Sequence, residues 1–198
     1  GMVTTNSSHL HDYTSSFNNH GKNLKKYFSP TIHNSFPYIH ESLGSNYRLT
    51  EMQSAIGIYQ LSKIKSWSRI RKRNATILLN AIKGLDAINS PVLPENYQHA
   101  WYKLYLTLNP RFLKKSFTRK QIIGLLNAQN VPCSFGGSGE MYKEHAFVKA
   151  TRKKSGFLPN ASFLESNSLM LQVHPTITQE ECNRRANILK TIIKNAQK

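Results

Sequence analysis

The chain has few acidic residues. Ten Asp and Glu stand against 27 Lys and Arg, which leaves a formal net charge of +17 over 198 residues. A field of this sign attracts anions such as sugar nucleotides, anionic lipid or nucleic acid. A nucleic-acid footprint gathers its basic residues on one face, whereas here they are scattered in short clusters along the sequence. Scatter favours an ordinary solvated surface, so nucleic-acid binding is the less favoured interpretation.

Cysteine is also scarce, and Cys133 and Cys182 form neither a CxxC pair nor a metal-ligand spacing. This usage is typical of a reduced, cytosolic compartment, although a disulfide between the two stays open. No apolar stretch approaches the ~20 residues that a membrane span needs. The N-terminus shows no basic segment followed by an apolar one, so no signal peptide is expected. Gly1 before Met2 resembles a tag remnant, which makes Met2 the expected native start.

Internal repeats and low-complexity tracts are absent, whereas bulky core residues are plentiful. Hydrophobic residues make up 39% of the sequence, with nine Phe, nine Tyr and two Trp. This composition argues against a disordered chain. The length suits one domain, or a small domain with an appendage.

The first 84 residues indicate a long helix preceded by irregular chain. Residues 1–5 are expected to form a short strand and residues 9–19 a weak helix, which His20-Gly21 ends. Residues 22–43 have no clear period and are interpreted as a long loop. Thr50 then opens a helix that runs to about Ile82 and is stopped by Lys83-Gly84. Its apolar face comprises Leu49, Met52, Ile56, Tyr59 and Ile64.

The remainder alternates strands with helices. Strands are predicted over residues 99–109, 131–135 and 168–174. Thr118 with Gln121, and Thr178 with Glu181, match the capping-box spacing at the start of helices. These helices are expected over residues 119–129 and from 178 to the C-terminus, with a short third helix over residues 140–150. The buried stripes are expected to be Ile122, Ile123, Leu125 and Leu126 in one helix, and Cys182, Ala186, Leu189 and Ile193 in the last.

The sharpest motif is the run from Gly44 to Gly57, which reads GSNYRLTEMQSAIG. It resembles the signature that opens the interdomain helix of the DegT/DnrJ/StrS family of nucleotide-sugar aminotransferases, which use pyridoxal phosphate (PLP). Residues 1–6, 19–21, 99–102 and 169–178 resemble further family segments in the same order, the last reading LMLQVHPTIT. The resemblance therefore covers nearly the whole chain.

This resemblance implies an α+β fold. The expected architecture is the small C-terminal domain of a fold-type I aminotransferase, with a three-stranded, mainly antiparallel sheet and helices on one face. Residues 1–43 would be a remnant of the large PLP-binding domain with a long loop, residues 44–84 the interdomain helix, and residues 85–198 the small domain. The chain is expected to be the truncated C-terminal portion of a nucleotide-sugar aminotransferase. Such an enzyme would act in the cytoplasm, in the biosynthesis of surface polysaccharides such as lipopolysaccharide.

Two residues carry the cofactor expectation that the resemblance brings. In the family, the Asn and Arg of this loop reach across the dimer toward the phosphate of the partner's PLP, and here they are Asn46 and Arg48. A guanidinium and an amide near a helix start suit a phosphate. The alternative is that Asn46 makes a turn and Arg48 pairs with Glu51.

The family's other cofactor groups have no counterpart in this sequence. PLP chemistry needs a lysine that anchors the cofactor, a carboxylate against its ring nitrogen and a phosphate cup, and the resemblance places these before Gly1. Lys22 and Lys25 follow the matching strand, whereas the family lysine precedes it. No catalytic residue is therefore assigned, and the chain alone is expected neither to bind PLP nor to transaminate. Its partners would be a second copy or a separately encoded N-terminal half, and an interaction module that complements such a half is the alternative function.

Other candidate sites are interpreted as structural. The Gly136–Gly139 segment could cradle a phosphate but lacks the Lys-Ser/Thr ending of a P-loop, so a flexible connection is favoured. It also replaces a Pro-x-His element of the family, which leaves inherited sugar contacts open. His9 and His11 are not expected to bind a metal, and no metal site is predicted. Cys133 is expected to be a small buried hydrophobe.

Overall fold

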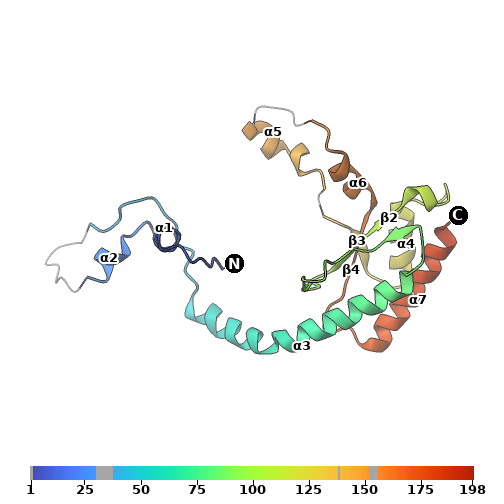
Figure 1. Cartoon of the computed structure of the whole chain (residues 1–198), viewed down its shortest axis with the longest axis horizontal. Coiled ribbons are helices and arrows are strands. Elements are labelled where there is room, and N and C mark those ends of the chain that lie inside the picture. The colour runs from blue at the N-terminus through green and yellow to red at the C-terminus, as the bar shows by residue number, and fades with distance from the viewer. Residues whose placement is uncertain (1, 30–37, 138, 152–155) are drawn as a thin grey trace. The chain divides into compact units, whose positions relative to one another are not determined.

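The structure is a computed structural model that describes residues 2–29, 38–137, 139–151 and 156–198. It divides into two compact units, residues 1–62 and 63–198, and the division falls within the longest helix. The predicted three-part division at residues 43 and 84 remains a prediction. The helices are α1 (Ser8–Asn18), α2 (Leu24–Tyr27), α3 (Glu51–Ile82), α4 (Arg119–Ala128), α5 (His145–Thr151), α6 (Pro159–Asn167) and α7 (Gln179–Ala196), and the 3-10 turns are η1 (Pro110–Phe112) and η2 (Met141–Lys143) (Figure 1).

The first unit holds α1, α2 and the start of α3. The predicted helix at residues 9–19 is confirmed by α1, which Ser7 caps by accepting a hydrogen bond from the Leu10 amide. The predicted strand at residues 1–5 is wrong for residues 2–5, because no partner strand pairs with them in the described chain. The loop expected over residues 22–43 also contains the short helix α2, whose cap Asn23 accepts from the Lys26 amide at 3.1 Å.

Helix α3 begins where the sequence predicts. The Thr50 amide donates to Gln53 Oε1 at 3.0 Å, and the Gln53 amide donates to Thr50 Oγ1 at 3.2 Å. This reciprocal pair satisfies two amides that a helix start otherwise leaves without acceptors. The helix runs for 32 residues, and Gly84 follows it with a φ of 79°. Such a left-handed residue just past the end is a common helix terminator.

The second unit is built on a four-stranded sheet in the order β1-β2-β4-β3, with every pair antiparallel. Three strands were predicted, and the fourth is the two-residue β1 (Ile88–Asn89), which pairs with Leu108 and Thr107. The other strands, β2 (Leu104–Leu108), β3 (Cys133–Phe135) and β4 (Ser168–Leu171), are shorter than expected. The α+β fold and the antiparallel pairing agree with the prediction, and the strand count corrects it.

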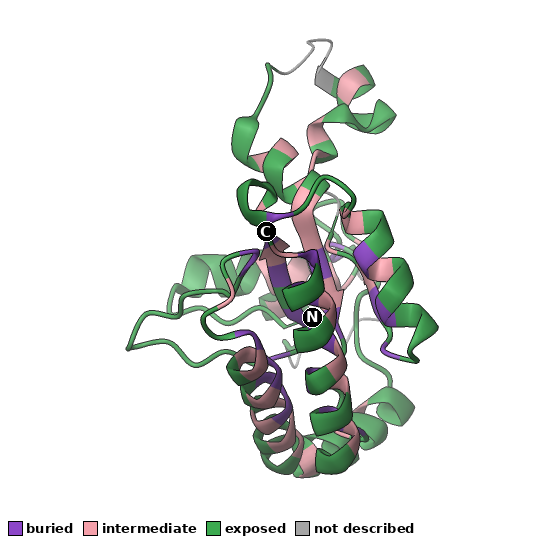
Figure 2. Ribbon diagram, turned by 90° about the vertical axis from the view of Figure 1, so that its right-hand side faces the viewer, coloured by how far each residue is buried: buried purple, intermediate pink, exposed green. Residues whose placement is uncertain are grey.

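One face of the sheet carries the core. Leu104 lies opposite Leu171, and Leu106 opposite Leu169, and all four side chains are buried. Helix α4 packs against β3, β4 and α7, so the expected placement of helices on one face is confirmed for α4 (Figure 1). Residues of α3, α4 and α7 belong to the same buried core as the strands (Figure 2). The predicted stripe of α7 is buried throughout, at Cys182, Ala186, Leu189 and Ile193, whereas in α4 only Ile122 and Leu126 are buried.

One expectation for residues 140–167 is corrected. The helix expected over residues 140–150 is split into η2 and α5, and residues 159–167 form the further helix α6, which leads directly into β4. Pro159 occupies the first turn of α6, where its missing N–H costs no hydrogen bond. No helix in the described part of the chain combines the length and the apolar character that a membrane crossing requires.

Candidate functional site

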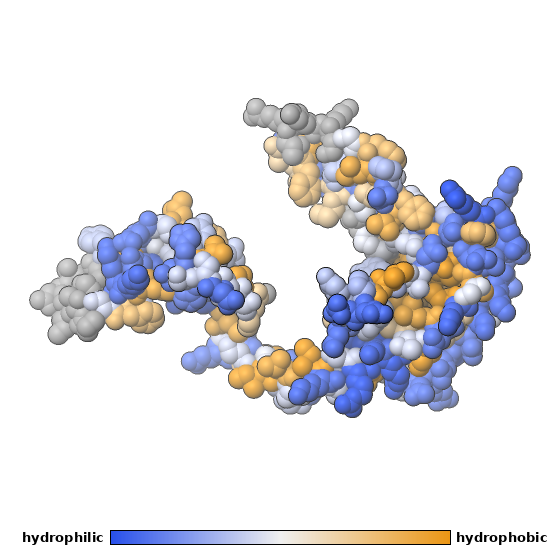
Figure 3. Space-filling model, viewed as in Figure 1, coloured by the Kyte–Doolittle hydropathy of each residue, from blue (hydrophilic) through white to orange (hydrophobic). Residues whose placement is uncertain are grey.

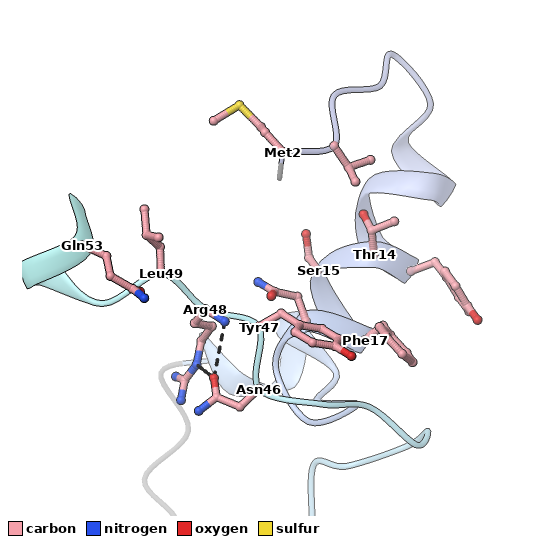
Figure 4. Close-up of a pocket in the computed structure, with 12 residues that line it drawn as sticks. Met2, Thr14, Ser15, Phe17, Asn46, Tyr47, Arg48, Leu49 and Gln53 are labelled. Atoms are coloured by element: carbon pink, nitrogen blue, oxygen red, sulfur yellow. Dashed lines mark hydrogen bonds between the residues drawn. The ribbon is translucent and has the colours of Figure 1, made fainter. Parts of the chain in front are cut away.

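A pocket of about 750 Å³ in the first unit lies beside the segment that the sequence singles out. Asn46 and Arg48 both line it, together with residues of α1 and the first turn of α3 (Figure 4). The remaining lining residues are Met2, Val3, Tyr13, Thr14, Ser15, Phe17, Asn18, Tyr47, Leu49 and Gln53. The structure therefore brings the two predicted site residues together at one surface.

Backbone hydrogen bonds fix the segment to the end of α1. The Ser45 amide donates to Phe17 O at 2.8 Å, and the Tyr47 amide donates to Asn18 O at 3.1 Å. Asn46 itself forms an antiparallel bridge with Asn19. The carbonyls at the end of a helix have no partner within the helix, so this segment supplies donors that they need. The position of Asn46 is thus set by main-chain contacts.

Two glycines allow this close approach. A Cβ on Gly44 would lie 2.7 Å from Phe17 O and would overlap the Gly21 nitrogen. Gly21 has a φ of 80°, and a Cβ there would collide with the carbonyl of Ser42. Only glycine adopts this conformation without strain and leaves room for the neighbouring backbone. The His20-Gly21 pair and Gly44 therefore hold the loop against α1.

The side chains of Asn46 and Arg48 bond to each other. Asn46 Oδ1 accepts from the Arg48 amide at 3.4 Å and from Arg48 Nε at 3.2 Å. The alternative interpretation had Asn46 make a turn and Arg48 pair with Glu51. Asn46 does make a turn, but no described ion pair joins Arg48 to Glu51. Both side chains are exposed, and the Arg48 Nη groups and the Asn46 amide group have no acceptor within the described chain.

This donor set fits a phosphate group. A charged guanidinium and an amide stand just before the N-terminus of a 32-residue helix, where anions are favoured. The described lining of the pocket contains no lysine and no carboxylate, and neither Lys22 nor Lys25 reaches it. The pocket can therefore hold an anion, but as described it has neither a group to anchor PLP covalently nor one to face its ring nitrogen.

The glycine-rich segment after β3 is packed rather than free. The Gly139 amide donates to Glu165 Oε2 at 2.6 Å, so a carboxylate of the chain takes the place that a bound anion would need. A Cβ on Gly139 would lie 2.7 Å from Ala161 O, and one on Gly136 would lie 2.5 Å from the Ser168 Cβ. The phosphate-cradle interpretation therefore has no support. Gly136 and Gly139 serve close packing, whereas a Cβ on Gly137 would meet nothing within 4 Å.

Other titratable groups in the second unit hold structure. The Lys143 ammonium and the Tyr142 hydroxyl, each bonded to the Glu140 carboxylate, keep the pKa of Glu140 below its ordinary value. Cys133 and Cys182 are free thiols, and burial raises the pKa of Cys133 to about 12. A thiol with such a pKa is a poor nucleophile. In the described residues no three His, Cys, Asp or Glu gather as a metal site.

Sequence reasoning missed a second polar cluster, at residues 99–103. Trp101 is 6% exposed and has a φ of 48°, a conformation that is rare for a bulky residue. Its amide donates to His99 Nδ1 at 2.8 Å, and the two rings are 4.2 Å apart. Arg71 of α3 donates to the carbonyls of Trp101 and Tyr102 at 3.4 and 2.8 Å. The aromatic run was interpreted as a strand, and no local signal reveals a contact 30 residues away.

Comparison with known proteins decides the relationship. Residues 1–190 match the model of the DegT/DnrJ/EryC1/StrS aminotransferase family. The chain belongs to this family. The resemblance seen in the Gly44–Gly57 run is thereby confirmed at the level of the family.

Three relatives illustrate the match. A solved aminotransferase from Psychrobacter cryohalolentis shares 32% identity and a TM-score of 0.88, over 98% of this chain and 51% of its own. The spore coat polysaccharide biosynthesis protein SpsC of Bacillus subtilis is 23% identical over 99% of this chain and 50% of its own length. The Escherichia coli GDP-4-keto-6-deoxy-D-mannose-3-dehydratase, solved with hydrated PLP, is 21% identical with a TM-score of 0.74, over 94% and 49%. The chain thus spans about half the length of these proteins.

Proposed function

We propose that residues 1–198 form the C-terminal half of a PLP-dependent nucleotide-sugar aminotransferase that serves surface polysaccharide synthesis, lipopolysaccharide included, in the cytoplasm. Family membership and the half-length match to the relatives support this proposal. The observation that carries it is the Asn46–Arg48 loop, which two glycines and main-chain bonds hold at the head of α3. The names of these relatives supply the PLP, the nucleotide sugar and the polysaccharide.

Asn46 and Arg48 are proposed to hold the phosphate of a PLP bound by a partner, in a homodimer or in a complex with a separate N-terminal half. When bound, PLP supplies the electron sink on which amine transfer depends. The contribution of this chain is to bind and orient. The side-chain oxygen Oδ1 of Asn46 accepts a hydrogen bond from Arg48 Nε, which leaves the Nη donors of the guanidinium for two oxygens of one phosphate.

Residues 1–198 by themselves are proposed to be inactive. The pocket beside Arg48 has no lysine and no carboxylate in its described lining. Transaminase activity would then require polypeptide equivalent to the other half of the relatives. The test mixes purified residues 1–198 with that half from a family member, and follows amine transfer to a 4-keto nucleotide sugar. Turnover is expected only in the mixture, and turnover by residues 1–198 alone would contradict the proposal.

Dehydration is a neighbouring activity, because one relative of the same fold is a 3-dehydratase by name. The two reactions leave different products, an amino sugar or a deoxy sugar. The mixture described above therefore needs its product analysed by mass. A deoxy product would keep the family and the PLP role of Arg48 but replace the aminotransferase assignment.

The second candidate function is an interaction module, which the surface of α3 favours. Met52, Ile56, Ile58 and Leu61 are between 57% and 77% exposed, and residues 52–62 contain no charge. Figure 3 shows apolar atoms over the first turns of α3. A helix that is apolar on several sides is normally buried, so a partner is proposed to cover it. Tyr59, 61% exposed, lies in the same stretch.

Co-purification of this chain with the N-terminal half of a family member tests this module. Ile56→Asp is expected to abolish co-purification, because a carboxylate would be buried in an apolar interface. Asn80→Asp adds the same charge at an exposed polar position of α3 beyond residues 52–62, and it is expected to leave co-purification intact. Equal co-purification of both variants would count against α3 as the interface.

Nucleic-acid binding remains the third alternative and rests on the net charge. Several arginines are engaged within the fold, since Arg73 bonds to Asn74 and Ile177 O, and Arg184 and Arg185 to Glu181. Their charges thus stabilise the chain itself. Affinity for an oligonucleotide that falls steeply with salt would revive this alternative, and weak binding at every salt concentration would remove it.

A further inference from the structure

The turn at residues 99–102 is held by more contacts than a simple connection needs. The left-handed Trp101 is held by His99, through a hydrogen bond and a ring contact, and by a hydrogen bond from Arg71 to its carbonyl. Backbone outliers persist only where surrounding structure enforces them, and they cluster at ligand sites. The result is that the Trp101 side chain is buried while the next one, Tyr102, is 70% exposed.

Two cations lie near the exposed ring of Tyr102. The Arg71 guanidinium carbon lies 5.7 Å from the centroid of Tyr102, and Lys103 Nζ lies 5.4 Å from it. Both distances are within the range of cation–π attraction. Among the described residues neither cation has a carboxylate partner. Arg71 uses one nitrogen for the Trp101 and Tyr102 carbonyls, which fixes its guanidinium and leaves its other donors without a described acceptor.

A solvent-facing aromatic ring with two unpaired cations suits a ligand that joins a planar ring to an anion. A nucleobase stacks on an aromatic side chain regardless of its identity, and a diphosphate binds guanidinium and ammonium groups. We propose that Tyr102, Arg71 and Lys103 form the subsite for the nucleoside diphosphate part of a sugar nucleotide. The proposal rests on the proposed function and adds residues of the second unit to it.

A single nucleotide fits this cluster better than a nucleic acid does. The cluster has one exposed ring and two cations within one turn of chain and one face of α3. A single-stranded nucleic acid instead uses successive aromatic platforms along a basic groove. Binding of an oligonucleotide is therefore one of the outcomes that the test separates.

The test is equilibrium binding of UDP, dTDP and GDP to residues 1–198, measured by calorimetry without PLP. Uridine and pyrophosphate are run beside them to separate the ring from the anion. Tyr102→Ala is expected to weaken all three nucleotides by at least about fivefold, the lower end for loss of one stacked base. Tyr102→Phe and Tyr97→Ala, the latter removing a ring that is 71% exposed elsewhere, are expected to bind as the parent chain does. Lys103→Ala is expected to weaken UDP more than uridine.

Absence of nucleotide binding in the parent chain, or equal binding by Tyr102→Ala, would overturn the subsite. Pyrophosphate bound as tightly as UDP would also overturn it, because the ring would then contribute nothing. An oligonucleotide bound more tightly than any nucleotide, and released steeply by salt, would assign the cluster to nucleic acid instead. The assay involves no amine transfer, so its failure leaves the proposed function standing, and failed turnover in the two-half mixture leaves nucleotide binding unaffected.

Discussion

Arg48 Nε lies 3.2 Å from Asn46 Oδ1, and this bond turns the guanidinium so that its Nη groups face outward from the loop. Asn46 is in turn fixed by its backbone bridge to Asn19. Arg48 is thus positioned from α1 through Asn46, and the cost of ordering its side chain is met before any ligand arrives.

The first prediction concerns Arg48. In a complex of this chain with the PLP-bearing half, Arg48→Ala is expected to weaken PLP binding about 10- to 100-fold, the loss of a charge-assisted hydrogen bond of about 1.5–3 kcal/mol. Arg48→Lys keeps the charge but loses the fork, so an intermediate loss is expected. PLP titration of the complex measures both. Arg69→Ala removes an exposed arginine outside the pocket as control, and an equal effect of Arg48→Ala and Arg69→Ala would refute the phosphate role.

The second prediction concerns Gly44. A methyl group there would collide with Phe17 O and Gly21 N, so Gly44→Ala is expected to destabilise the loop by roughly 1–3 kcal/mol. Gly57→Ala is the matched control, since its Cβ meets nothing within 4 Å, and it is expected to stabilise α3 by about 0.5–1 kcal/mol. Hydrogen exchange of the Ser45 and Tyr47 amides should quicken only in Gly44→Ala. Unchanged exchange would show that the loop is not held as described.

A third prediction tests the junction between α3 and the chain before α7. Asn74 is fully buried, donates to His174 O at 3.1 Å and accepts from Arg73 Nη2 at 2.9 Å. Asn74→Ala leaves these buried groups without partners and should cost about 2–3 kcal/mol of unfolding free energy. Asn80→Ala, at an exposed position of the same helix, should change it by less than about 0.5 kcal/mol. Urea unfolding measures both changes, and similar midpoints for Asn74→Ala and Asn80→Ala would contradict the role given to Asn74.

The fourth prediction is a pH dependence at the start of α7. The guanidinium groups of Arg184 and Arg185 lower the pKa of Glu181 to about 2. A lowered folded-state pKa gives stability that is present above the unfolded value near 4.5 and lost as pH falls toward 2. Glu181→Gln should therefore lower the urea midpoint at pH 7, with the difference shrinking between about pH 4.5 and 2. Glu180→Gln removes the same charge from the same turn without breaking these pairs, and a pH-independent difference for Glu181→Gln would contradict the assignment.

Helix signals with a local cause could be predicted from the sequence. Thr50, Thr118 and Thr178 all cap helices as expected, because a cap needs only its own side chain and an amide three residues on. The second half of a capping box, in which the side chain three residues on bonds back to the cap amide, was not predicted correctly for α7. There the Glu181 carboxylate accepts hydrogen bonds from Arg184 and Arg185 instead. The two-residue strand β1 was missed because its pairing with β2 depends on residues about twenty positions away.

The site was predictable only in part. Only the family resemblance pointed to Asn46 and Arg48, since neither residue type alone distinguishes a turn from a phosphate contact, and their phosphate role stays a prediction. Arg48 bonds to Asn46 and not to Glu51. This choice of partner follows from the backbone path that Gly21 and Gly44 permit. The left-handed Trp101 and its contact with Arg71 could not be predicted, because a positive φ in a bulky residue is imposed by tertiary contacts.

The most direct test of the account is reduction of residues 1–198 by borohydride in the presence of PLP, followed by mass spectrometry of the digested chain. If the cofactor-anchoring lysine lies on other polypeptide, the lysines of this chain should carry only scattered, sub-stoichiometric pyridoxyl groups. Adding the other half should move a stoichiometric adduct onto that half. A single lysine of residues 1–198 that is fully modified without it would contradict the account.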